Sequence, residues 1–219
     1  MNEAFNKLEK AKQERIIRTA LREFAEKGYK HASTNAIVKN AGISKGMLFY
    51  YFNSKQDLYY FLVEYSIDTI RTGFIDKIDT SIPDVIERLA HIAYLKWNFF
   101  LENPEVSMFI TSLVLKDNVP LPEPLQKKYD ELFRIGMEKA YFFNNADYRL
   151  FRDDIDPQKA IQLIQWTLYG YRDDFLQRYH GKGLHELPME QLWDEFAQYL
   201  DILKKVFYRA ETESIYEEK

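Results

Sequence analysis

Apolar residues recur at helical spacing along most of the chain, and glycines and prolines mark where one helix gives way to the next. The clearest case is the segment 9–27, where charged residues separate the apolar ones. Its apolar positions are Ile16, Ile17, Ala20, Leu21, Phe24 and Ala25. Gly28 follows as a C-terminal stop. The pattern predicts an amphipathic helix over 9–27.

Two short helices are predicted next. Ser33 or Thr34 can cap the first, which ends near Ala41, and Ser44 can cap the second, which runs to about Phe52. Two short helices joined by a glycine-containing turn form a helix-turn-helix, whose second helix enters the major groove of DNA.

The rest of the chain repeats this pattern with longer helices. Ser54 opens one that runs to about Ile78, and prolines mark the first turns of most others, where a missing N–H costs nothing. The later predicted helices are 83–101, 104–115, about 20 residues after the linker 119–124, 157–179 and 188–210. No alternating strand pattern occurs, so the predicted fold is all-α with about nine helices.

Composition supports a compact protein of the reducing cytoplasm. The 219 residues include no cysteine, 8 glycines and 7 prolines, and the N-terminus lacks the apolar core of a signal peptide. We found no stretch long enough to span a membrane without charges. The expected location is therefore the cytoplasm.

Charge is distributed unevenly. The whole chain carries −4, but residues 1–60 hold 11 basic and 6 acidic residues, giving +5 and leaving −9 for the remainder. Chance variation on solvated helix faces is one explanation. The other is that only the N-terminal part meets a polyanion.

The run Leu48-Phe49-Tyr50-Tyr51-Phe52 in the second short helix can be sorted by angle. With Leu48 at the core, Phe52 lies about 40° away and Tyr51 about 60° away, on or beside the buried face, whereas Tyr50 lies about 160° away and points outward. The outward surface also includes Lys45 and Gly46, flanked by Met47 and Phe49. A bare glycine allows close approach, a tyrosine hydroxyl can donate to a phosphate, and Met or Phe can touch a thymine methyl.

Two further positions suit phosphate groups. Lys55 lies in the first turn of its helix, where a positive charge opposes the dipole but complements an anion bound to free N–H groups. Thr34 can offer a hydroxyl at the start of its own helix. Simple capping also explains Thr34 and Ser54.

The stretch "RIIRTALREFAEKGYKHASTNAIVKNAGISKGMLFYYFNSKQDLY" resembles the DNA-binding domain of the TetR family of bacterial transcriptional regulators. The positions that match the family pattern are Thr34, Ile37, Ala41, Gly42, Ser44, Gly46, Leu48, Phe52, Lys55 and Leu58. Val38 and Phe49 depart from the usual alanine and tyrosine, and Met47 from a frequent threonine. The resemblance covers about a quarter of the chain.

The resemblance implies a helix-turn-helix head, residues 1–54, and a helical effector-binding and dimerisation body, residues 55–219. The residues expected to contact DNA are Thr34, Asn35, Ser44, Lys45, Gly46, Met47, Phe49, Tyr50, Tyr51 and Lys55. It also implies a homodimer built from the last two long helices. The expected interface residues are Leu168, Phe175, Trp193, Phe196, Leu200, Leu203 and Phe207.

The resemblance further implies a small-molecule effector inside the body. Aromatic residues make up 16% of the chain, which suits an apolar or aromatic ligand, although an aromatic stripe is more often plain core. The candidate pocket residues are Tyr94, Trp97, Phe100, Met108, Phe109, Phe133, Met137, Tyr141 and Trp166. The ligand would move the helix that begins at Lys55 and so change the separation of the two recognition helices.

Sequence motifs of catalysis are absent, and the four histidines have no metal-binding spacing, so we expect no enzyme, no metal and no cofactor. The favoured interpretation is a repressor released from a palindromic operator by its effector. The alternative is a helical interaction or carrier module whose head is purely structural.

Overall fold

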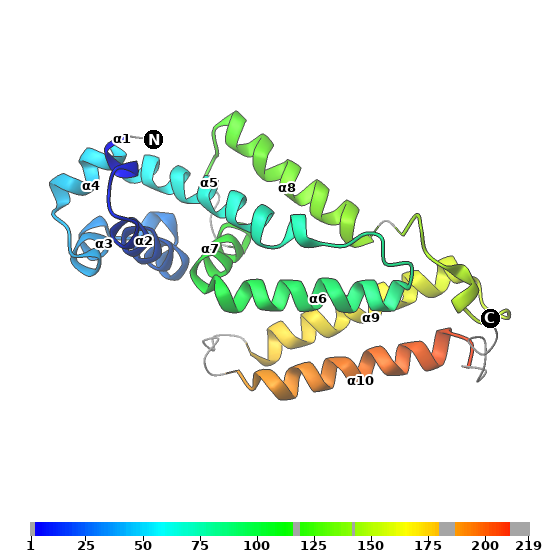
Figure 1. The fold of residues 1–219 in the computed structure, drawn as a ribbon. Helices are drawn as coiled ribbons and strands as arrows, with labels where there is room; N and C mark the ends of the chain where they lie inside the picture. The colour runs from blue at the N-terminus through cyan, green and yellow to red at the C-terminus, as the bar shows by residue number, and fades with distance from the viewer. Residues whose placement is uncertain (1–2, 116–118, 142, 180–186, 211–219) are drawn as a thin grey trace. The chain divides into compact units, whose positions relative to one another are not determined.

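The computed structural model describes residues 3–115, 119–141, 143–179 and 187–210 (Figure 1). They form ten α-helices and two 3-10 helices, and the one extended pairing among them is an antiparallel bridge between Phe151 and Tyr208. The predicted all-α class is confirmed. The elements are α1 (Glu3–Asn6), α2 (Lys10–His31), α3 (Thr34–Ala41), α4 (Lys45–Phe52), α5 (Lys55–Gly73), η1 (Ile75–Lys77), α6 (Val85–Glu102), α7 (Pro104–Leu115), α8 (Glu123–Tyr141), η2 (Tyr148–Leu150), α9 (Pro157–Arg178) and α10 (Met189–Phe207).

Serine caps begin three consecutive helices of the N-terminal part, as the sequence predicts. The Oγ atoms of Ser33, Ser44 and Ser54 accept the backbone N–H three residues later at 3.3, 3.1 and 3.0 Å. These bonds satisfy N–H groups that have no partner within the helix. Gly42 follows α3 with φ of 66°, a left-handed conformation that glycine adopts without strain.

The helix predicted to reach Ile78 ends five residues earlier, at Gly73, and the chain turns through η1. A Cβ atom at Gly73 would lie 2.8 Å from the Phe99 ring of α6. Glycine therefore allows the end of α5 to approach α6 closely, and this tertiary contact has no periodic signal in the sequence.

The short helix α1 was not predicted. Its Phe5 side chain is 1% exposed, and its ring centroid lies 4.9 Å from that of Phe52 in α4 and 5.5 Å from that of Phe61 in α5. The Gln13 side chain donates to the carbonyl groups of residues 6 and 8 at 3.1 and 2.8 Å. A four-residue helix is too short to show periodicity, so packing by one ring decides its position.

The chain divides into two compact units. The first comprises residues 1–77 and 95–139, and the second comprises residues 78–94 and 140–219. The helix-turn-helix thus shares its unit with α5, α7 and α8 rather than standing apart. The boundary after residue 54 that we predicted for a DNA-binding head remains a prediction.

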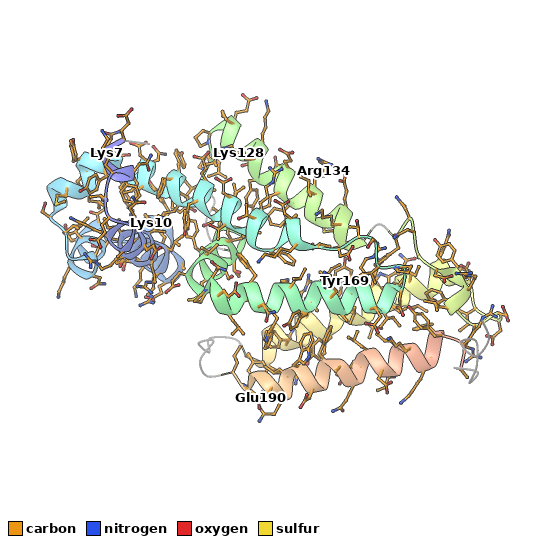
Figure 2. All side chains as sticks on the ribbon, in the orientation of Figure 1. Lys7, Lys10, Lys128, Arg134, Tyr169 and Glu190 are labelled. Atoms are coloured by element: carbon orange, nitrogen blue, oxygen red, sulfur yellow. The ribbon has the colours of Figure 1, made fainter. Side chains whose placement is uncertain are left out.

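In the first unit, α2 packs against α3, α5 and α7. The rings of Phe24, Tyr59 and Phe109 come from α2, α5 and α7, and all three side chains are fully buried. On the surface, Arg22 of α2 pairs with Glu105 of α7 at 2.8 Å. Lys128 of α8, labelled in Figure 2, forms an ion pair with Glu64 of α5.

In the second unit, α9 and α10 lie side by side. The Tyr171 ring of α9 contacts those of Phe196 and Tyr199 of α10, at 5.5 and 5.4 Å between centroids. The apolar core includes the start of α6, α9, α10 and the segment between α8 and α9. Its buried members are Val85, Ile86, Leu89, Phe143, Phe151, Ala160, Ile161, Ile164, Leu200 and Leu203.

Two polar groups tie the second unit together. The Arg88 guanidinium, in a side chain that is 1% exposed, donates to the carbonyl of Ile82 at 2.6 and 2.8 Å and lies over the Phe143 ring. The Tyr208 hydroxyl donates to Asp84 at 2.7 Å, and burial raises the pKa of Tyr208 so that it stays protonated. The buried Arg88 and the half-buried Tyr208 therefore both have hydrogen-bond partners.

Candidate nucleic-acid interface

The helix α4 is the second helix of the helix-turn-helix, and its residues divide by exposure. Leu48 and Phe52 are 1% and 4% exposed, whereas the Tyr50 side chain is 64% exposed. Lys45 and Gly46 are exposed as well. The angular sorting of these five residues from the sequence is confirmed.

Met47 and Phe49 flank this outward face and are half-buried. Each keeps part of its side chain accessible beside Tyr50. The accessible surface of α4 therefore combines one ammonium group, one bare glycine and three large side chains.

Tyr51 departs from the DNA contacts predicted from the sequence. It is 5% exposed, because the Phe5 ring of α1 lies against it at 5.7 Å between centroids. The sequence placed Tyr51 beside the buried face, but α1, which covers that side, was not predicted. The structure thus favours a packing role for Tyr51 over a contact with DNA.

The predicted contacts at helix starts lie where expected. Thr34 is the first residue of α3 and half-buried, and Asn35 beside it is exposed. Ser33, not Thr34, caps α3, so the Thr34 hydroxyl takes no part in the cap. Ser44 is exposed and caps α4 through its Oγ atom.

Lys55 begins α5 and is half-buried. Its ammonium nitrogen lies 5.0 Å from the centroid of the Tyr29 ring and donates to the carbonyl of Lys30 at 3.4 Å. Lys55 therefore holds a defined position at the N-terminal end of α5. Sequence reasoning missed Tyr29, although its place directly after Gly28 was a usable signal.

Charge within the segment that contains α3 and α4 is of one sign, although Glu23 of α2 accepts from the backbone N–H of Ser33 beside the start of α3. Residues 27–56 include five lysines and no aspartate or glutamate. These lysines are Lys27, Lys30, Lys39, Lys45 and Lys55. A surface of this composition attracts phosphate groups, and few other partners require one.

The nine predicted pocket residues do not gather in one unit. Trp97, Phe100, Met108, Phe109, Phe133 and Met137 belong to the first unit, and Tyr94, Tyr141 and Trp166 belong to the second. Phe109 is fully buried in the ring cluster with Phe24 and Tyr59. Tyr94, Met108, Phe133, Met137 and Trp166 are exposed by 43–58%, and the Tyr141 side chain lies outside the described residues.

The seven predicted interface residues lie on α9 and α10 but mostly face inward. Leu200 and Leu203 belong to the core of the second unit, and Leu168, Phe196 and Phe207 pack against that core. Phe175 and Trp193 are half-buried. Most of these side chains therefore already pack within one subunit and leave little surface for a partner subunit.

A different set of large apolar side chains on the same helices is exposed. Trp166 is 58% exposed and Ile202 is 52% exposed, and three further large apolar side chains of the two helices are exposed by 41–47%. This exposed apolar row comprises Leu163 and Trp166 of α9 and Tyr199, Ile202 and Val206 of α10. The spacing of residues 199, 202 and 206 was a signal that the sequence analysis did not use. The apolar face of α10 is broad, so the sequence pattern does not show which apolar residues face the core and which face solvent.

Within the described residues, no group of three or more His, Cys, Asp or Glu side chains could hold a metal ion. Among the same residues, no helix is both long enough and apolar enough to cross a membrane.

Comparison with known proteins points to one family. Residues 16–60 match the model of the bacterial regulatory proteins of the tetR family. The uncharacterised helix-turn-helix regulator YuxN of Bacillus subtilis is 40% identical over 67 residues, which are 31% of this chain and 23% of YuxN. The biofilm operon negative regulator IcaR of Staphylococcus aureus is 24% identical over 198 residues, covering 88% of this chain and 98% of IcaR.

The fold agrees over nearly the whole length. A TetR family regulator from Chloroflexus aurantiacus superposes with a TM-score of 0.61 at 23% identity, covering 95% of this chain and 99% of that one. The N-terminal segment thus matches the TetR family of transcriptional regulators, and the fold of the chain is similar to that of a TetR family regulator. Regulators of this family bind DNA as dimers and respond to small molecules. In this chain, α3 and α4 lie within the residues that match the family model.

Proposed function

We propose that the protein is a repressor that binds a palindromic operator as a homodimer and leaves it when a small apolar or aromatic effector binds. The observation that carries this proposal is the outward face of α4, where an exposed tyrosine and glycine adjoin lysines and no acidic residue occurs from 27 to 56. A surface with lysines and no carboxylate suits a polyanion better than it suits a purely structural head.

The proposed DNA contacts have separate tasks. Lys55 and Thr34 contact phosphates at the starts of α5 and α3, and Tyr50 donates to a further phosphate. Met47 and Phe49 lie against base edges, where they recognise thymine methyl groups. Gly46 lets the backbone of α4 approach the groove.

The dimer is proposed to form through the exposed apolar row on α9 and α10. Its five large side chains are exposed by 41–58% within one subunit, and burial of apolar area drives association. Gly170, one turn after Trp166, has open space around a built Cβ atom, which suits the close approach of a second helix.

The effector is proposed to contact the apolar residues of the first unit that remain accessible. These are Trp97, Phe100, Met108, Phe133 and Met137. Ligand binding there would shift α5, which begins at the DNA-contacting Lys55, and so change the separation of the two recognition helices. Such a ligand must bind the released form more tightly than the DNA-bound form.

The test is a selection of duplexes from a randomised library by the full chain at about 0.1 M salt, followed by affinity measurements. We expect an inverted repeat to be enriched and to bind at least about a thousandfold more tightly than shuffled duplex. Enrichment of no sequence would favour a carrier module instead.

The effector can be sought separately by thermal unfolding with a panel of apolar and aromatic metabolites. A ligand at about 100 times its Kd stabilises the fold by about 2.7 kcal/mol. A stabilising compound that leaves operator affinity unchanged would contradict the proposed release mechanism.

A further inference from the structure

The ammonium group of Lys55 contacts two consecutive residues at the end of α2, Tyr29 and Lys30. It lies 5.0 Å from the centroid of the Tyr29 ring, and it donates to the Lys30 carbonyl at 3.4 Å. An ammonium over a tyrosine face is attracted by the quadrupole of the ring. Two different groups thus fix one flexible side chain.

The backbone of Gly28 makes this arrangement possible. Gly28 has φ of 68° and ψ of 164°, a conformation essentially restricted to glycine, which interrupts α2. The chain turns there and continues until Ala32 donates back to the Gly28 carbonyl at 3.0 Å. Gly28 therefore determines where both the Tyr29 ring and the Lys30 carbonyl lie.

The Tyr29 ring is itself fixed by the core of the first unit. It stacks on Phe24 at 6.2 Å with 8° between the planes, and it meets Tyr59 edge to face at 5.0 Å. Both neighbours are fully buried and contact Phe109 of α7. Tyr29 cannot move far without disturbing a cluster that joins α2, α5 and α7.

We propose that Tyr29 is a positioning residue for DNA binding, which holds the Lys55 ammonium where an operator phosphate meets the start of α5. This inference rests on the proposed function. A free lysine side chain loses up to about 2 kcal/mol of rotamer entropy when it is fixed. A lysine that is already held over Tyr29 loses less on binding, so its phosphate contact is stronger.

The inference is tested by a double-mutant cycle with Tyr29→Leu and Lys55→Ala, using the duplex selected by the wild-type chain. We expect Tyr29→Leu to weaken binding about two- to fivefold, the range expected of a partly exposed cation–π contact. In the Lys55→Ala background the same substitution should have no further effect. Tyr29→Phe retains the ring face and should bind like wild type.

The salt dependence of duplex binding distinguishes a variant that loses the position of the Lys55 ammonium from one that loses its charge. Lys55→Ala should reduce the slope of log K against log salt by about 1, because one phosphate contact disappears. Tyr29→Leu should leave that slope unchanged. Tyr65→Leu is the matched control, since it removes a half-buried tyrosine of α5 that lies ten residues from Lys55.

Three outcomes would overturn the inference. Tyr29→Leu could bind like wild type, or it could weaken binding equally with and without Lys55, which would mean a structural role alone. Failure of the wild-type chain to select any duplex would overturn the proposed function together with the inference. A failed cycle on a duplex that wild type binds would overturn only the inference.

Discussion

The outward face of α4 and the exposed apolar row of α9 and α10 both present large apolar side chains to solvent, yet their surroundings differ. Tyr50 is 64% exposed and Trp166 is 58% exposed. Tyr50 lies in a stretch with lysines and no acidic residue, whereas charges of both signs, paired as Arg172–Asp173, Arg178–Asp174 and Lys205–Asp201, occur on the helices of the second surface. Similar exposed apolar area can therefore serve different partners, and the neighbouring charges indicate which.

Each surface also includes a glycine inside a helix. A Cβ atom at Gly46 would meet only the Ser44 Oγ atom, at 3.9 Å, and one at Gly170 would meet nothing within 4 Å. Alanine would fit at both positions and would favour the helix. Neither glycine is needed for packing within one subunit, so each is better explained by the close approach of a partner.

The largest effect is expected from the neighbouring tyrosines of α4, which test whether exposure separates recognition from folding. Tyr51→Ala should destabilise the fold by about 3–5 kcal/mol, because it removes a buried ring. Tyr50→Ala should leave thermal unfolding unchanged and weaken duplex binding by about two- to tenfold, the loss of one hydrogen bond. Equal melting temperatures of the two variants would refute the division of α4 into two faces.

The next effect concerns the apolar row. Trp166→Glu should give a monomer and lower affinity for an inverted repeat about a hundredfold or more, because the second half-site is no longer bound within the same complex. Sedimentation and fluorescence anisotropy measure both results. Gln158→Glu is the control, since it adds a charge at an exposed position of the same helix. A dimeric Trp166→Glu protein would show that the copies associate elsewhere.

A smaller effect is expected at the N-terminal cap of α4. This helix has eight residues, so its stability depends more on its ends than that of the 19-residue α10, which begins without a side-chain cap. Ser44→Ala should cost about 1 kcal/mol of stability in denaturant unfolding. Ser44→Thr keeps a capping hydroxyl and should restore most of that stability. Loss of the same size in both variants would argue against the cap.

The smallest effect is expected at the two glycines. Gly46→Ala should stabilise the fold by up to about 1 kcal/mol while weakening DNA binding, and Gly170→Ala should weaken dimerisation without changing the subunit fold. For Gly46→Ala, the free energy of unfolding should therefore rise while the affinity for the duplex falls. If Gly46→Ala binds the duplex as well as wild type does, close approach of the α4 backbone is unnecessary.

The two surfaces also differ in how far the sequence predicted them. In α4, one buried residue, Leu48, sets the angle of every other residue in two helical turns, and local serine caps fix the ends. In α10 the apolar face is wide enough to meet both the core and solvent, so periodicity alone could not assign Leu203 inward and Ile202 outward. Periodicity placed Tyr51 beside the buried face, but it gave no sign that α1, which is too short for a periodic signal, covers that side.

The central claim is that the outward face of α4 in each subunit contacts DNA, while the exposed apolar row of α9 and α10 forms the contact between two subunits. Its most direct test compares the affinity of the wild-type chain for a selected inverted repeat with that for the same duplex with one half-site scrambled. We expect at least about a hundredfold weaker binding to the scrambled duplex, because only one recognition helix then finds its site. Equal affinities would show that the second subunit contributes nothing to operator binding and would contradict the account.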